Sequence, residues 1–71
     1  MDTRTILDVK GMSCGSCVHH VGEALEHLDG VHQVEVDLAR GKVAVRHDDG
    51  RAPVAALIEA VTDAGYDAAA A

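Results

Sequence analysis

Three stretches in which apolar and polar residues alternate predict strands with one buried face. The first covers residues 5–9, the second covers residues 31–38, and the third covers residues 42–46. The turn at residues 39–41 is short and contains glycine, so the second and third strands should form a hairpin. The side chains expected to face the interior are Leu7, Val9, Val34, Val36, Leu38, Val43 and Val45.

Between these strands the apolar residues follow the spacing of a helix. The first helix should begin near Ser16, which is placed as its N-cap, and Gly30 suits the left-handed position that ends it. The second should have Pro53 at its first position and should end at Gly65. The expected apolar faces are Val18, Val21, Leu25 and Leu28 in the first helix, and Val54, Leu57, Ile58 and Val61 in the second.

A short last strand beginning at Tyr66 completes the order β-α-β-β-α-β. Two helices on one face of a four-stranded antiparallel sheet form the ferredoxin-like α+β sandwich, which is the predicted fold. We see no linker, repeat or second domain, and therefore expect one domain over residues 1–71. The alanines at positions 68–71 add little to this prediction.

Composition and charge narrow the possible partners. The chain has 12 acidic and 6 basic residues, a formal net charge of −6, which argues against nucleic acid and against anionic membranes. A partner with a basic patch is compatible with this charge, and Glu23 and Glu26 are candidates to meet it. No apolar run is long enough to insert in a membrane, and the first ten residues do not resemble a signal peptide. We therefore expect a cytoplasmic protein with reduced thiols.

Cys14 and Cys17 are the two cysteines of the chain, and they are separated by two residues at the predicted start of the first helix. Backbone N–H groups and the positive end of the helix dipole favour thiolates there. Two thiolates suit a soft cation: Cu(I) is the physiological candidate, and Hg(II), Ag(I), Cd(II) or Zn(II) are candidates in vitro. Structural zinc and iron–sulfur clusters usually need four protein ligands, whereas two sulfurs satisfy a near-linear Cu(I) ion.

A thiol–disulfide oxidoreductase is the alternative from another class, because redox motifs also place two spaced cysteines at a helix start. No tryptophan precedes this pair and no proline lies between its members. A disulfide here would close too short a loop to stabilise the fold much. Nothing resembles a positioned base and nucleophile, so we do not expect an enzyme.

The segment GMSCGSC, residues 11–17, resembles the signature of the heavy-metal-associated domain family. Residues 28–31, Leu-Asp-Gly-Val, and residues 64–66, Ala-Gly-Tyr, are similar to two further segments of that family. The resemblance covers almost the whole chain and implies the βαββαβ fold, with Cys14 and Cys17 as the ligands of Cu(I) or a related metal. Family members are bacterial and other copper chaperones, N-terminal domains of copper P-type ATPases, and mercury-binding proteins.

The resemblance also assigns roles to neighbouring residues. It implies that Met12 supports the loop from beneath, that Gly11 lets the backbone turn, and that Tyr66 lies near the site, as in bacterial copper chaperones. His20 departs from the family; three positions after Cys17, it is a candidate third ligand or pH-sensitive neighbour. His19 should point elsewhere, and His27, His32 and His47 are predicted to lie on the surface.

The expected function is therefore Cu(I) binding and transfer by a cytoplasmic metallochaperone. The implied partner is a copper-transporting P-type ATPase or another copper protein. A mercury-binding protein and an ATPase domain remain open alternatives. The protein should be a monomer without metal, and a shared ion could bridge two copies.

Overall fold

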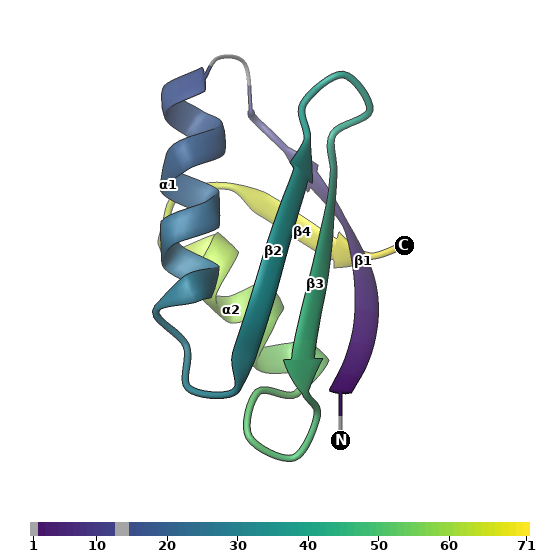
Figure 1. The fold of residues 1–71 in the computed structure, drawn as a ribbon. Coiled ribbons are helices and arrows are strands. Elements are labelled where there is room, and N and C mark those ends of the chain that lie inside the picture. Colours follow the sequence, from purple (N-terminus) through teal and green to yellow (C-terminus); the bar gives the residue numbers. More distant parts are fainter. Residues whose placement is uncertain (1, 13–14) are drawn as a thin grey trace.

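The computed structural model describes residues 2–12 and 15–71 and confirms the predicted order of elements (Figure 1). None of the helices in these residues combines the length and the apolarity needed to cross a membrane. The elements are β1 (Asp2–Lys10), α1 (Gly15–Glu26), β2 (Val31–Asp37), β3 (Lys42–Asp48), α2 (Val54–Asp63) and β4 (Asp67–Ala70).

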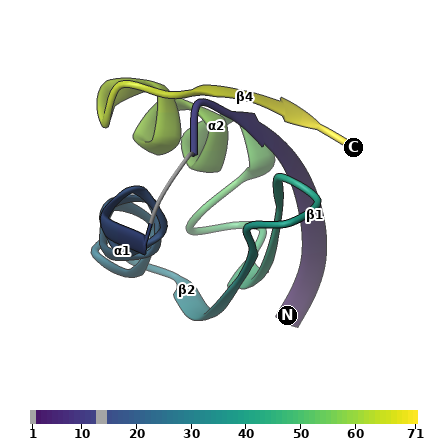
Figure 2. The same ribbon diagram turned by 90° about the horizontal axis from the view of Figure 1, so that it is seen from above.

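The four strands form one antiparallel sheet in the order β2-β3-β1-β4. β1 is the longest strand, and it pairs with β3 through Asp2–Asp8 and with β4 through Leu7–Lys10. Viewed from above, the sheet curves around one side of the molecule and both helices lie within the curve (Figure 2). This arrangement is the predicted ferredoxin-like fold.

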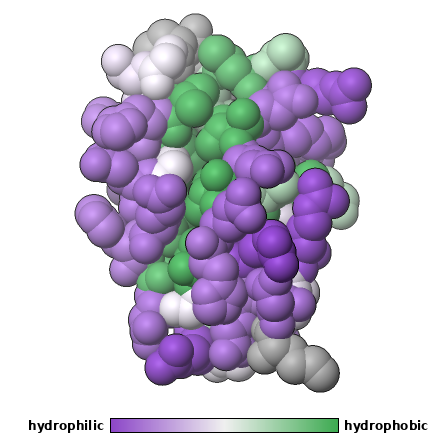
Figure 3. Space-filling model, viewed as in Figure 1, coloured by the Kyte–Doolittle hydropathy of each residue, from purple (hydrophilic) through white to green (hydrophobic). Residues whose placement is uncertain are grey.

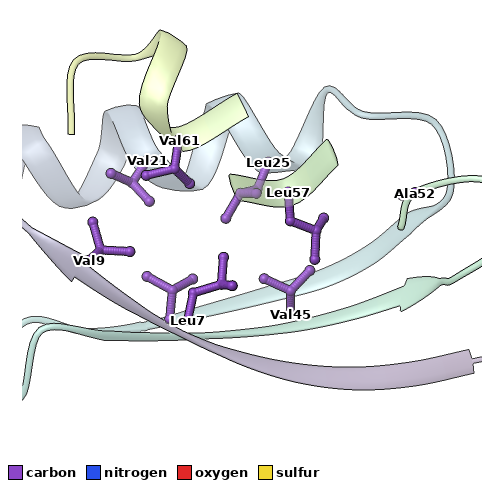
Figure 4. Packing of buried hydrophobic residues seen from close by; sticks show 9 residues of the cluster. Leu7, Val9, Val21, Leu25, Val45, Ala52, Leu57 and Val61 are labelled. Carbon is purple, nitrogen blue, oxygen red and sulfur yellow. The ribbon is translucent and has the colours of Figure 1, made fainter. Parts of the chain in front are cut away.

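The core lies between the sheet and the two helices (Figure 4). β-Branched and leucine side chains from the strands meet the apolar faces of both helices, as the periodicity predicted. The buried hydrophobic residues are Leu7, Val9, Val21, Leu25, Val43, Val45, Ala52, Leu57 and Val61.

Two of the residues predicted to face the core do not reach it. Leu38 is 41% exposed, because β2 ends at Asp37 and the strand alternation no longer fixes the direction of the next side chain. Val18 is only partly buried and lines a surface groove beside β2.

The predicted helix starts were each wrong by about one residue. Ser16 lies within α1, because this helix begins at Gly15. Pro53 is the N-cap of α2, with φ −67° and ψ 162°, and not its first helical residue. Gly30 does adopt the expected left-handed conformation, with φ +97°, in the turn that leads from α1 to β2.

The prediction that His47 lies on the surface is wrong, because this side chain is fully buried. Its Nδ1 lies 2.6 Å from the carbonyl oxygen of Ala52, and its Nε2 lies 2.7 Å from Oγ1 of Thr5. A carbonyl oxygen only accepts hydrogen bonds, so Nδ1 carries the proton that it donates to Ala52. His47 shares the inward face of β3 with Val43 and Val45. His27 and His32 are exposed, as predicted.

The alanine-rich end of the chain is structured, although its sequence predicted little. β4 pairs with β1 from Leu7 opposite Ala70 to Lys10 opposite Asp67. The backbone N–H of Ala71 also donates to the carbonyl oxygen of Ile6 at 3.0 Å. Alanine has a weak preference for strands, so pairing with β1 and not local propensity places this segment in the sheet.

Candidate metal centre

α1 begins at one end of the molecule (Figure 1), and the predicted metal ligands, Cys14 and Cys17, lie at and just before its start in the sequence. Cys17 is the third residue of α1, in the helical turn where the sequence placed it, and it is partly exposed. Cys14, the second predicted ligand, lies outside the described residues. The structure therefore gives the position of one of the two predicted ligands.

The electrostatic surroundings of Cys17 favour a thiolate. Backbone N–H groups in the first turn of a helix have no partner within the helix, and they carry a partial positive charge. The first turn of α1 contains no acidic residue that would offset this charge. A sulfur in this position is therefore suited to bind a soft cation.

Met12 connects the loop to the interior. It is partly buried and packs against the hydrophobic core, whereas the preceding Gly11 is exposed. Gly11 has φ +98°, a left-handed conformation that side chains with a Cβ rarely adopt. The chain thus turns sharply at the end of β1, and the next side chain, Met12, packs against the core.

Tyr66 lies beside the start of this loop, although it comes from the segment between α2 and β4. A Cβ added at Gly11 would lie 3.4 Å from Cδ1 of the Tyr66 ring. The ring is partly buried and packs against the core, and the backbone N–H of Tyr66 donates to the carbonyl oxygen of Val61 at 3.3 Å. Both ends of the sequence therefore contribute to the surroundings of the loop.

The histidines of α1 are both exposed. Nε2 of His19 lies 3.5 Å from Oε1 of Glu23, one helical turn further on, a pairing that sequence reasoning missed although its i,i+4 spacing signals it. Within residues 2–12 and 15–71, no three His, Cys, Asp or Glu side chains are grouped so that they could hold a metal. His20 as a third ligand remains a prediction.

Comparison with known proteins agrees with this geometry. The heavy-metal-associated domain family matches residues 6–67. The copper chaperone CopZ of Staphylococcus aureus is 45% identical over 65 residues, which cover 92% of this chain and 96% of that protein.

Two solved structures show how widely the same fold is shared. Oxidised MerP from Ralstonia metallidurans superimposes with a TM-score of 0.94 at 31% identity, covering 99% of this chain and 97% of that chain. The Cu(I)-loaded N-terminal domain of a potential copper-translocating P-type ATPase from Bacillus subtilis superimposes with a TM-score of 0.93 at 30% identity, covering 99% and 88%. With a family match over nearly its whole length and this shared fold, the chain belongs to the heavy-metal-associated domain family.

Proposed function

We propose that this protein is a cytoplasmic carrier of Cu(I) that binds the ion between the thiolates of Cys14 and Cys17. The observation that carries the proposal is the 45% identity to a copper chaperone over nearly the full length of both chains. The position of Cys17 in the first turn of α1 supplies the physical basis, because that turn favours a thiolate.

The ligand set favours Cu(I) over zinc. A structural zinc ion needs about four protein ligands, whereas the sequence has two cysteines. Two thiolates satisfy a soft ion of low coordination number. Met12 packs against the core, Tyr66 lies beside Gly11, and His20 is a candidate third ligand.

Delivery of the ion is proposed to proceed by exchange of sulfur ligands. A thiolate of the partner adds to the two-coordinate ion and one thiolate of the carrier leaves, so that the copper is never free in solution. The partner is proposed to be a copper-transporting P-type ATPase or another copper protein, since domains of such ATPases share this fold. The domain itself, residues 1–71, acts in this scheme as a carrier and not as an enzyme.

A competition titration tests the proposal. Reduced protein is titrated with Cu(I) against a strong chromophoric chelator, with Zn(II) in parallel, and the same is done for Cys14→Ser, Cys17→Ser and the control variant Ser16→Ala. We expect tight one-to-one binding of Cu(I) that either cysteine variant abolishes and that Ser16→Ala retains. The proposal would be overturned if both cysteine variants bound Cu(I) as tightly as the parent protein, or if the parent protein bound zinc more tightly than Cu(I).

Mercury binding is the second candidate, and the match to MerP favours it. Any exposed dithiol binds Hg(II), so affinity for mercury alone does not distinguish the two functions. Metal transfer distinguishes them, because a copper carrier should pass Cu(I) rapidly to the cysteine pair of an ATPase domain. A dithiol that instead cycles readily and reduces insulin would indicate an oxidoreductase.

A further inference from the structure

A groove about 290 Å³ in volume lies between α1 and β2, and its lining begins at Val18, directly after Cys17. Figure 3 shows a continuous hydrophobic band along the middle of this face, between the polar surfaces of the helix and the sheet. The residues lining the groove are Val18, His19, Gly22, Glu23, Glu26, Val34 and Val36.

Gly22 is a glycine that the fold itself does not require. It lies in the interior of α1, its φ is not in the left-handed range, and a Cβ added there would meet no atom within 4 Å. Glycine in a helix interior is less stable than alanine. Gly22 lowers the stability of the helix but keeps the groove open. The presence of glycine here is explained if a second molecule enters the groove.

The strand beside the groove has an unpaired edge. β2 is the outermost strand of the sheet next to β3, so one side of its backbone has no partner strand in the described part of the chain. An extended segment can hydrogen-bond to such an edge as an additional strand. Every second side chain of that segment would then point toward α1, where Val18 and Gly22 leave apolar space.

The charges around the groove indicate what kind of segment fits. Glu23 and Glu26 line the groove on the α1 side, whereas Glu35 and Asp37 alternate with Val34 and Val36 along β2 and lie on the opposite face of the sheet. The sequence has no Lys or Arg between residues 11 and 39. The next cation, Arg40, already lies 3.8 Å from a carboxylate oxygen of Asp37. A second copy pairing through β2 would bring the same carboxylates together, which disfavours self-association through this edge.

We propose that this groove and the β2 edge bind an extended segment of a partner protein in which apolar residues alternate with Lys or Arg. The apolar side chains enter the groove, the alternating cations point to the opposite face of the sheet, where Glu35 and Asp37 lie, and the backbone pairs with β2. This interaction needs no metal ion, so it can be tested on the metal-free protein, apart from the proposed copper transfer.

The test uses the ¹⁵N-labelled, metal-free protein and a synthetic peptide that alternates valine and lysine. A peptide with glutamate in place of lysine is the matched control. We expect the lysine peptide to shift the amide signals of Val18, Gly22 and Val34–Val36, to protect β2 amides from exchange, and to bind less tightly as salt is raised. The glutamate peptide should leave these signals unchanged.

Gly22→Leu fills the groove and should weaken binding of the peptide by about tenfold or more, because the apolar side chains then have no space. Ala55→Leu, at an exposed position of α2, is the matched control and should bind as the parent protein does. Thermal unfolding checks that both variants fold, and Gly22→Ala provides a smaller change if Gly22→Leu does not.

The proposal is overturned if millimolar peptide shifts no groove signal or if the shifts map to α2. It is also overturned if a Gly22 variant that folds binds as tightly as the Ala55 control. Sedimentation that reveals a dimer lost in Gly22→Leu would assign the groove to a second copy of this chain, which also contradicts the proposal.

Discussion

Thr5 and His47, 42 residues apart in the sequence, lie with Oγ1 and Nε2 only 2.7 Å apart inside the molecule. The other ring nitrogen of His47 donates to the carbonyl oxygen of Ala52. One imidazole therefore joins β1, β3 and the segment that leads into α2. Among the described residues it is the fully buried polar side chain, so its two hydrogen bonds offset the cost of removing it from water.

Replacing either member of this pair should destabilise the fold. His47→Leu leaves the carbonyl oxygen of Ala52 and the hydroxyl of Thr5 without this partner, and should lower the free energy of unfolding by about 1–3 kcal/mol. Thr5→Val removes one hydrogen bond while keeping the shape, and should cost about 1 kcal/mol. Urea denaturation measures both, with the exposed His32→Ala as the control. Unchanged midpoints in both variants would contradict the proposed role of these bonds.

Gly30→Ala should destabilise the protein for two reasons. The residue has φ +97°, which costs a residue with a Cβ about 1–2 kcal/mol. That Cβ would also lie 2.6 Å from Cβ of Arg51, so one of the two segments must move. Gly22→Ala, in open space within a helix, should instead raise stability by about 0.5–1 kcal/mol. Thermal melts of the two variants should therefore shift in opposite directions, and shifts of the same sign would refute the comparison.

Asp48 should make stability depend on pH in the acidic range. The backbone N–H of Gly50 donates to its carboxylate at 3.0 Å, and this bond, helped by the charge of Arg51, holds the pKa of Asp48 below its ordinary value of 3.8. A lowered pKa means that the folded state favours the ionised carboxylate. The contribution is thus complete above the ordinary value and is lost as pH falls through the folded-state value.

Melting temperatures of the parent protein and Asp48→Asn, measured from neutral pH down to strongly acidic pH, test this. The parent should be the more stable protein at neutral pH, and the difference should shrink as the medium becomes acidic. The neighbouring Asp49→Asn is the control. A difference that grows on acidification would mean that the sign is wrong.

Cys17→Ser should leave the fold intact while removing metal binding. The side chain is partly exposed and is not part of the buried core, so the free energy of unfolding should change by less than about 1 kcal/mol. Circular dichroism and thermal unfolding of the metal-free protein measure this apart from copper affinity. Loss of the folded state would show that Cys17 has a structural role that its position does not suggest.

Tyr66→Ala should speed loss of Cu(I) from the loop, since it removes the ring that lies against Gly11. Residues that support metal ligands typically contribute about tenfold or more to affinity, and we expect an effect near the lower end of that range. Tyr66→Phe keeps the ring and should behave as the parent. Stopped-flow transfer of Cu(I) to a chelator measures the rates. Equal rates for Tyr66→Ala and Tyr66→Phe would show that the ring does not affect metal release.

Periodic patterns predicted the strands and helices because the core selects one face of each element. The same alternation applies to His47, which shares the inward face of β3 with Val43 and Val45, but we predicted it on the surface because of its residue type, and this was wrong. Only the folded chain brings Thr5 and Ala52 to its ring nitrogens. A short last strand was predicted from Tyr66, but the alanines did not indicate how far it extends, because pairing with β1 determines this. For the site, the spacing of residues predicted the position of Cys17, whereas the approach of Tyr66 to Gly11 depends on packing between the two ends of the chain.

α1 begins at one end of the molecule and β3 ends at the other (Figure 1), so Cys17, in the first turn of α1, and His47, near the end of β3, lie toward opposite ends. The residues proposed to bind the metal are thus separate from the hydrogen bonds of His47 that stabilise the fold. A carrier built in this way has nothing to unfold or rebuild at each delivery. Because Cys17 is not part of the buried core, we expect exchange of metal at the thiols to leave the core unchanged through repeated rounds of delivery.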